Sequence, residues 1–419
     1  MNEKTPIKLK YGAEYLTVEV PTARIMDILE PEDLPGVVEP LEEVRRSLQN
    51  PIGSRPLAEL AKGKKNVMII CSDITRPAPS DVLVPPILEE LNKAGVRDEQ
   101  MTIVFALGYH RPHTKEEQRK LVGEAVFERV KCIDHDRHNC VNFGKSSKGT
   151  PIDIFAPITK SDLIIATGNL ELHYFAGYSG GDKALMPGVC SKETVQANHS
   201  MLFDPSARSG VISGNPIRQD IEEIGRLAGV AFIVNAVLNS NNEIVISVAG
   251  DPVKAHREGC TYIDRMYKRT IPHKADIVIC SAGGHPKDIN LYQAQKAFEN
   301  ASHSVKDGGI IILAARCKEL LGEPTFDEWM RSAKSIDDPI NRIKAEFVLG
   351  AHKAAVICQV LKRNKAYLIS DMPKELVEKC FFTPADSVEE ALAEALQEQG
   401  AGAKVLIMPF ANSTVPYVG

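Results

Sequence analysis

The chain has 419 residues, with 50 Lys and Arg against 55 Asp and Glu, a formal net charge of -5 and 43% hydrophobic residues. At roughly 100–200 residues per domain, this length predicts two or three domains, and the mild acidity argues against a nucleic-acid partner. No run of about 18 apolar residues is present, and the first residues, MNEKTPIKLKYG, contain no apolar signal segment, so we expect a cytoplasmic protein with no membrane partner.

Short apolar segments rich in β-branched residues alternate with helix-like segments along most of the chain. This alternation is typical of parallel sheets covered by helices, because strands buried on both faces carry apolar residues almost throughout. Strands are predicted over residues 66–70, 102–107, 162–167, 230–238, 243–250, 276–280, 309–315, 366–370 and 404–409. The predicted fold class is α/β, with two domains, mainly parallel sheets and an active-site cleft between the domains.

Turn-forming and capping residues mark the ends of several helix-like segments. Asn215 followed by Pro216 indicates a helix start, because asparagine caps free backbone amides and proline is preferred at the first helical position. Helices are predicted over 86–94, 216–227 and 388–398.

A domain boundary is predicted near residues 268–275, where a basic segment ends and the strand–helix alternation restarts. Residues 1–270 would form a larger domain that begins with a β-ribbon, and residues 271–419 a smaller one. The G-x-x-x-x-G-K-[ST] phosphate-binding loop is missing from the sequence, and the nine scattered cysteines do not indicate a disulfide framework.

Two predicted strands are followed by loops with reactive side chains, and ligands of α/β sheets bind at such carboxyl ends. The loop CSDITRPAPS supplies Asp73, Thr75 and Arg76, which suit binding of a carboxylate or phosphate, unless an Asp–Arg pair merely ties the loop together. The loop GYHRPHT places His110 as a candidate acid or base. We assign His113 a structural role, as a cap of the next helix.

A third loop, GNLELHYFAGYSGGDKALMPGV, is rich in glycine and carries His173 and Lys183. Glycines allow backbone amides to approach a ligand, and a lysine there can be a cation, a base or a covalent anchor. His199 follows in a predicted helix as a candidate metal ligand. After the strand at 276–280, Gln293 and Lys296 lie three residues apart and so share one helical face.

Five motifs between residues 66 and 301 together resemble the lactate racemase family: SDITRPAPS, GYHRPHT, HYFAGYSGGDKALMPGV, NHSM and LYQAQK. This family consists of 2-hydroxyacid racemases and epimerases with a nickel-pincer nucleotide, the Ni(II)-pyridinium-3,5-bisthiocarboxylic acid mononucleotide. The resemblance implies an isomerase that inverts C2 of a 2-hydroxy acid. Its partners would be that small-molecule acid and the proteins that make the cofactor.

The resemblance also implies a role for each matching residue. His110 and His173 would be the two acid/base residues. Lys183 would hold the cofactor covalently through a thioamide, and His199 would ligate nickel. The side chains that would line the cofactor site are Asp73, Ile74, Thr75, Arg76, Gln293 and Lys296. The side chains that would contact the substrate are Arg76, Tyr292 and Lys296.

The implied chemistry is hydride transfer coupled to proton transfer. A base removes the hydroxyl proton while hydride leaves C2, and the planar keto acid receives both on its other face. Members that act on lactate have a tryptophan near the substrate in the second domain. Here Trp329 is the single tryptophan, and the corresponding region contains His352 and Lys353. We therefore expect lactate or a larger acid, polyhydroxylated acids included.

Two other functions fit the same residues. In a metal-dependent hydrolase or lyase, His110, His173 and His199 would bind one ordinary divalent ion. In a non-catalytic carrier of the nickel cofactor, Lys183 would hold the nucleotide without turnover. A covalent adduct on Lys183 would distinguish the racemase from the hydrolase, and turnover would distinguish the racemase from the carrier.

Overall fold

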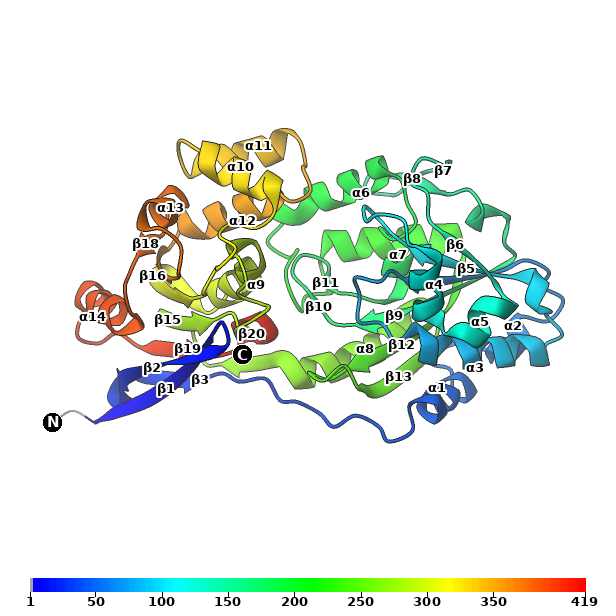
Figure 1. Cartoon of the computed structure of the whole chain (residues 1–419), viewed down its shortest axis with the longest axis horizontal. Coiled ribbons are helices and arrows are strands. Elements are labelled where there is room, and N and C mark those ends of the chain that lie inside the picture. Colours follow the sequence, from blue (N-terminus) through cyan, green and yellow to red (C-terminus); the bar gives the residue numbers. More distant parts are fainter. Residues whose placement is uncertain (1–2) are drawn as a thin grey trace. The chain divides into compact units, whose positions relative to one another are not determined.

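A computed structural model describes residues 3–419 and divides the chain into two compact units. The central unit is Asp33–Met266, and the terminal unit joins Met1–Glu32 to Tyr267–Gly419. Each unit contains a six-stranded sheet with helices packed against it (Figure 1). The α/β class with mainly parallel sheets is confirmed.

The sheet of the central unit has the strand order β13-β12-β9-β4-β5-β6. Neighbouring strands are parallel except β12 and β13, which pair antiparallel. The bounds are β4 (Val67–Ser72), β5 (Met101–Ala106), β6 (Lys131–Asp134), β9 (Leu163–Leu170), β12 (Val230–Leu238) and β13 (Ile244–Gly250). Two antiparallel ribbons accompany them, β7 (Cys140–Lys145) with β8 (Pro151–Phe155) and β10 (Leu172–His173) with β11 (Gly177–Tyr178).

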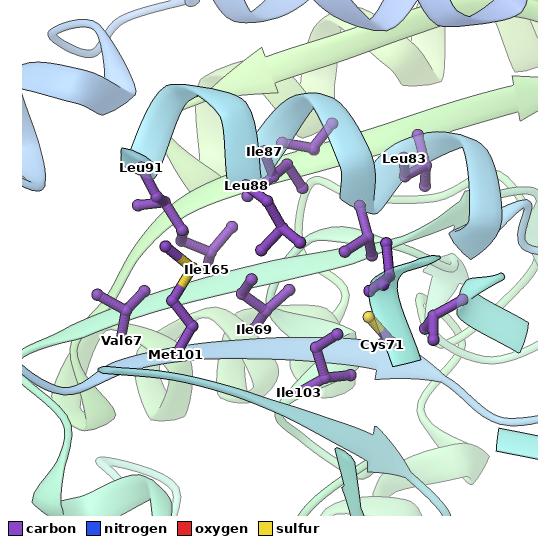
Figure 2. Packing of buried hydrophobic residues seen from close by; sticks show 14 of the residues in the cluster. Val67, Ile69, Cys71, Leu83, Ile87, Leu88, Leu91, Met101, Ile103 and Ile165 are labelled. Carbon is purple, nitrogen blue, oxygen red and sulfur yellow. The ribbon is translucent and has the colours of Figure 1, made fainter. Parts of the chain in front are cut away.

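Helix α3 (Ser80–Lys93) covers one face of this sheet. Its residues Leu83, Ile87, Leu88 and Leu91 belong to one buried core with Ile69 and Ile103 of the strands, and Figure 2 shows Leu88 and Leu91 directed at the sheet. The helix begins earlier than the predicted 86–94 and runs through two prolines. The sequence prediction started it at a proline because proline is usually tolerated only in a first turn.

The remaining helices of the central unit flank the same sheet. Their bounds are α1 (Pro40–Gln49), α2 (Leu57–Leu60), α4 (Lys115–Val122), α5 (Glu124–Arg129), α6 (Lys192–His199), α7 (Pro216–Ala228) and α8 (Pro252–Tyr267). Asn215 caps α7 as predicted, with its side-chain oxygen accepting from the amides of Ile217 and Arg218. Within residues 3–419, every helix is too short or too polar to cross a membrane.

The sheet of the terminal unit has the order β18-β17-β16-β15-β19-β3 and is parallel throughout. Its strands are β3 (Ile25–Ile28), β15 (Ala275–Ser281), β16 (Val305–Ala314), β17 (Lys365–Ile369), β18 (Thr383–Pro384) and β19 (Val405–Met408). A further parallel pair joins β14 (Lys268–Ile271) to β20 (Val415–Val418). Its helices are α9 (Leu291–Ser302), α10 (Pro324–Ser332), α11 (Asp337–Ala345), α12 (His352–Leu361), α13 (Lys374–Lys379) and α14 (Val388–Gln399).

The N-terminal segment belongs to the terminal unit, a grouping that differs from a simple division into 1–270 and 271–419. The predicted ribbon is the antiparallel pair β1 (Lys4–Tyr11) and β2 (Glu14–Pro21). Its apolar residues, such as Leu9 and Val18, share a core with strands β15, β16 and β19, while β3 is the edge strand beside β19. These pairings form between distant parts of the chain, so local sequence patterns do not reveal them.

Both sheets reverse their strand order at one point. In the central unit the chain runs from β4 outward through β5 and β6, then returns to place β9 on the other side of β4. In the terminal unit it runs from β15 through β16 and β17, then places β19 on the other side of β15. Ligands of open α/β sheets bind outside the carboxyl ends of strands at such reversals. The loops after β4, β5, β9 and β15 carry the predicted site residues.

Candidate active site

The loops after β4 and β5 bring Asp73 and His110 together. His110 Nδ1 lies 2.5 Å from Oδ2 of Asp73, and the Thr75 hydroxyl also donates to this carboxylate. Burial raises the pKa of Asp73, but the hydrogen bond and charge of His110, with Thr75 and Arg76, more than offset this and lower it. Asp73 is thus an acceptor, which places the His110 proton on Nδ1 and a lone pair on the half-exposed Nε2 edge.

His113 holds the backbone next to Asp73 in place. Its Nδ1 donates to Asp134 at 2.8 Å, and its Nε2 accepts the amide of Ile74 at 3.1 Å. The ring is fully buried and meets Phe105 edge to face. His113 is structural, as predicted, but Thr114 caps helix α4 instead. Threonine accepts from amides at a helix start better than a histidine held by a carboxylate.

The glycine-rich loop after β9 forms the small β10–β11 ribbon that holds His173. The amide of Ala176 donates to His173 Nδ1 at 3.2 Å, so the ring carries its proton on Nε2. Burial lowers the pKa of His173 well below its usual value, and the charges of Lys183, His199 and Arg76 add to this. His173 is therefore a neutral imidazole at neutral pH.

Lys183 lies on the short helix η4 (Gly181–Ala184), which follows Gly180. Gly180 has φ of 73°, and a Cβ there would come 2.6 Å from Leu170, so this turn requires glycine. Within residues 3–419, neither a hydrogen bond nor an ion pair holds the Lys183 amine. Burial, together with the charges of Arg76 and Arg218, lowers its pKa to about 7. A substantial fraction of the amine is therefore uncharged and nucleophilic at neutral pH.

The charge of Arg76 acts both on Asp73, in the loop after β4, and on His173 and Lys183, in the segment after β9. Its positive charge lowers the pKa values of Asp73, His173 and Lys183. The side chain is exposed, and within residues 3–419 it makes no hydrogen bond or ion pair of its own. It is therefore able to bind a carboxylate bidentately.

His199 ends helix α6 and is buried. Asn198 donates from Nδ2 to Ile217 O and to Asp220, so the atom that lies 3.1 Å from His199 Nδ1 is its oxygen, which accepts a hydrogen bond from the ring N–H. This hydrogen bond places the lone pair of His199 on Nε2. A metal-binding histidine typically donates its other ring N–H in this way, so the surroundings of His199 are compatible with a metal ligand.

The ring of Phe175 lies between the rings of His173 and His199 and contacts both. The centroid of Phe175 lies 4.5 Å from that of His173 and 4.7 Å from that of His199, in edge-to-face geometry with both. Within residues 3–419, no three His, Cys, Asp or Glu side chains are arranged to hold a metal ion. An ordinary hydrolase ion needs about three protein ligands, a set that His110, His173 and His199 do not form here. A cofactor that brings its own sulfur donors needs only one imidazole.

In the terminal unit, Tyr292, Gln293 and Lys296 lie on the first turns of α9. Asn290 caps this helix by accepting the amide of Gln293 at 3.0 Å. Gln293 is exposed, while Tyr292 and Lys296 are half-buried. The side chains thus share the beginning of one helix, at the strand reversal of the terminal sheet.

His352 and Lys353, which stand where a tryptophan is expected, differ in their surroundings. His352 is buried, accepts the amide of Gly350 on Nδ1 and stacks on Phe347, so it has a structural role. Lys353 donates to the carbonyl of Tyr292 at 2.8 Å and lies 4.0 Å from the centre of that ring. Burial lowers the pKa of the Lys353 amine to about 7.

Sequence reasoning missed several buried polar residues around the histidines. Asn198 accepts a hydrogen bond from His199, and Asn215 donates to the carbonyl of Phe175 in the loop that carries His173. Arg218 contributes a buried guanidinium to the same loop. Asn215 was recognised only as a helix cap. Asn198 directly precedes His199, which was a usable signal, whereas nothing local distinguishes Arg218 from an exposed helix residue.

Titratable side chains gathered at the strand reversal of a parallel sheet are typical of an α/β enzyme. Residues 11–210 match the lactate racemase N-terminal domain, and residues 271–415 match the lactate racemase C-terminal domain. A lactate racemase of Thermoanaerobacterium thermosaccharolyticum is 36% identical over 98% of both chains, and one of Lactiplantibacillus plantarum is 35% identical over 88% of this chain and 89% of the other.

Solved structures give the same result. The lactate racemase apoprotein of Thermoanaerobacterium thermosaccharolyticum superposes with a TM-score of 0.89 at 34% identity, covering 99% of this chain and all of the other. The chain belongs to the lactate racemase family and is an isomerase of the racemase type.

Proposed function

We propose that the protein inverts C2 of a 2-hydroxy acid, lactate or a larger acid, by proton-coupled hydride transfer with a nickel-pincer nucleotide. The observation that carries this proposal is the Lys183 amine, to which no side chain of residues 3–419 forms an ion pair and whose pKa burial lowers to about 7. Relatives of this chain are named lactate racemase, which supports a 2-hydroxy acid as substrate.

The amine of Lys183 suits covalent attachment of the cofactor. An amine that forms a thioamide must first be uncharged, and the charges of Arg76 and Arg218 favour that form. Conversion to a thioamide also removes the possibility of a buried ammonium, which is costly without a partner. We propose that His199 holds nickel through Nε2, and that Asp73, Ile74, Thr75 and the other cofactor-site residues named from the family motifs line the nucleotide.

When bound, the pincer nucleotide supplies the hydride acceptor that no side chain provides. The chain itself handles the proton. His110 accepts the hydroxyl proton on Nε2, because its Nδ1–H is fixed to Asp73, whose carboxylate stabilises the resulting imidazolium. The C2 hydrogen leaves as a hydride in the same step, which yields a 2-keto acid.

His173 acts on the other orientation of the substrate. Its Nε2–H donates a hydrogen bond to the substrate oxygen, because Ala176 occupies Nδ1. The imidazolium formed on His110 is the acid that returns the proton to the keto oxygen when hydride is delivered to the other face. The neutral His173 ring holds that oxygen by its Nε2–H hydrogen bond and keeps its own proton, so both histidines end the cycle as they began. Arg76 binds the substrate carboxylate, and we propose that Tyr292, Gln293 and Lys296 also contribute to substrate and cofactor binding.

Intact-mass measurement combined with a turnover assay tests this function. The protein is produced together with the cofactor-biosynthesis proteins that we propose as its partners, and chiral 2-hydroxy acids are assayed for loss of optical purity. We expect a covalent adduct that disappears in Lys183→Ala and Lys183→Arg, because a guanidinium cannot replace an amine nucleophile. A hydrolase would show turnover without an adduct, and a carrier would show the adduct without turnover.

A further inference from the structure

Arg218 is buried to 1% exposure on the first turn of α7, yet among residues 3–419 no carboxylate lies within hydrogen-bond distance of it. Its nearest acidic neighbour is Glu222, at 3.9 Å from Nε, and Glu222 is itself paired bidentately with Arg257. Burying a charged group with incomplete pairing costs several kcal/mol, so an apolar side chain would serve stability better. This points to a role other than stability.

The hydrogen bonds of Arg218 hold the loop that carries His173. Its Nε donates to the carbonyl of Ala176 at 3.2 Å, and its NH2 donates to the carbonyl of Tyr178. These two carbonyls flank Gly177, where φ is 79° and a Cβ would come 2.2 Å from Val211 O. Because one planar guanidinium donates to the carbonyl before Gly177 and to the carbonyl after it, it fixes the tight turn of the loop.

The same loop sets the protonation of His173. The amide of Ala176 donates to His173 Nδ1, while the carbonyl of the same residue accepts from Arg218. Asn215, the cap of α7, donates to the carbonyl of Phe175 at 2.9 Å. The first turn of α7 thus binds the carbonyls on both sides of the amide that faces His173.

We propose that Arg218 is a positioning residue that fixes the Nε2–H tautomer of His173 by holding the Ala176 peptide. This inference rests on the proposed function only for its catalytic consequence, because the tautomer is a property of the cofactor-free protein. The charge of Arg218 also lowers the pKa of His173, and so favours the neutral ring.

The test is ring-nitrogen NMR of cofactor-free protein labelled with ¹⁵N-histidine, with His173 assigned by its loss in His173→Gln. We expect wild type to show a protonated Nε2 and an unprotonated Nδ1, and Arg218→Met to show averaged tautomers. Arg226→Met is the matched control, since Arg226 is exposed on the same helix. Arg218→Lys keeps the charge but cannot donate to both carbonyls with the geometry of a guanidinium, so we expect it to lose the tautomer preference as well. It replaces Arg218→Met in the test if that variant does not fold.

Activity of the loaded enzyme provides the second readout. Arg218→Lys should keep the cofactor adduct and KM but lower kcat about 10²-fold, as expected for misplacement of a catalytic group by about 1 Å. An unchanged His173 tautomer in the Arg218 variants overturns the inference, whatever the activity. A wild type that shows the tautomer but never racemises a 2-hydroxy acid overturns the proposed function and leaves the positioning role intact.

Discussion

Asp73 and His110 follow different strands, yet their side chains form a hydrogen bond of 2.5 Å between Oδ2 and Nδ1. Asp73 is almost completely buried, whereas the His110 ring remains accessible. A buried carboxylate that fixes one ring nitrogen directs the other nitrogen at the reacting group and stabilises the imidazolium. The pair therefore forms one functional group.

We expect Asp73→Asn to retain the covalent cofactor but to lose most of the contribution of His110, about 10²-fold in kcat out of the 10²–10⁴-fold typical of a positioned base. An amide keeps the shape but cannot stabilise the imidazolium with a charge. The measurement is kcat together with intact mass. Normal turnover by Asp73→Asn would show that His110 works without this carboxylate.

Lys183→Gln should raise the pKa of His173. Burial is the main cause of the lowered pKa of His173, and the charge of Lys183 is the next. Because the pKa of Lys183 is about 7, the lysine is mostly charged in the acidic range where His173 titrates, so its removal favours the imidazolium. The value should stay below 6.5, since burial persists.

The measurement is an NMR pH titration of His173 in cofactor-free protein, so it does not depend on activity. Lys192→Gln is the control, because Lys192 is exposed at the start of α6. A His173 pKa that stays the same in Lys183→Gln would mean that the two groups do not interact. Formation of a thioamide on Lys183 removes the same charge, so it should act on His173 in the same direction.

The predicted strands were correct because buried parallel strands are apolar along their whole length. Strand β12, for example, has the predicted bounds. The candidate loops were found for a related reason, since a polar segment that follows such a strand lies at the ligand edge of the sheet. Local composition is sufficient for both inferences.

Side-chain partners were not predictable in this way. A pair of Asp73 with Arg76 was the local alternative, but Asp73 binds His110, because β4 and β5 are neighbours in the sheet. The sequence does not state which strands pair. The same holds for Arg218, whose environment depends on the packing of α7 against a distant loop.

Gly225→Ala should destabilise the central unit although alanine is the better helix former. A Cβ at Gly225 would lie 2.2 Å from Oδ1 of the buried Asp182, beside Lys183. Overpacking typically costs about 1–3 kcal/mol, more than the gain of about 1 kcal/mol in helix propensity. Calorimetry should show a Tm that is lower by a few degrees, and the exposed Leu227→Ala should leave it within about 1 °C. An unchanged Tm for Gly225→Ala would mean that Asp182 moves away freely.

Lys353→Met should weaken the use of acids that carry a polar group beyond C3 more than the use of lactate. The Lys353 amine lies against Tyr292, which we propose contacts the substrate. Loss of one hydrogen bond is worth about 0.5–1.5 kcal/mol, or roughly 2–10-fold in kcat/KM. The control is Lys362→Met, which removes a surface ion pair just after the same helix. Equal losses for lactate and for the larger acids would exclude a role in substrate selection.

Removal of each histidine should separate proton transfer from nickel binding. His110→Ala and His173→Ala should keep nickel and the covalent adduct but lower turnover by about 10²–10⁴-fold, the usual contribution of an acid or base. His199→Ala should lose nickel as well as activity, because we propose that its Nε2 is a ligand whose other nitrogen is held by Asn198.

Metal content and turnover are measured on the same three preparations. The equilibrium constant of the reaction is fixed by the substrate, so each histidine variant must lose kcat/KM by the same factor in both directions, which checks the assay. The metal result then assigns the roles, because the rings of His173 and His199 lie on the same phenylalanine and resemble each other in surroundings. If His110→Ala or His173→Ala released nickel while His199→Ala kept it, the ligand and the bases would have to be exchanged, and a site built on several histidines would become the better explanation.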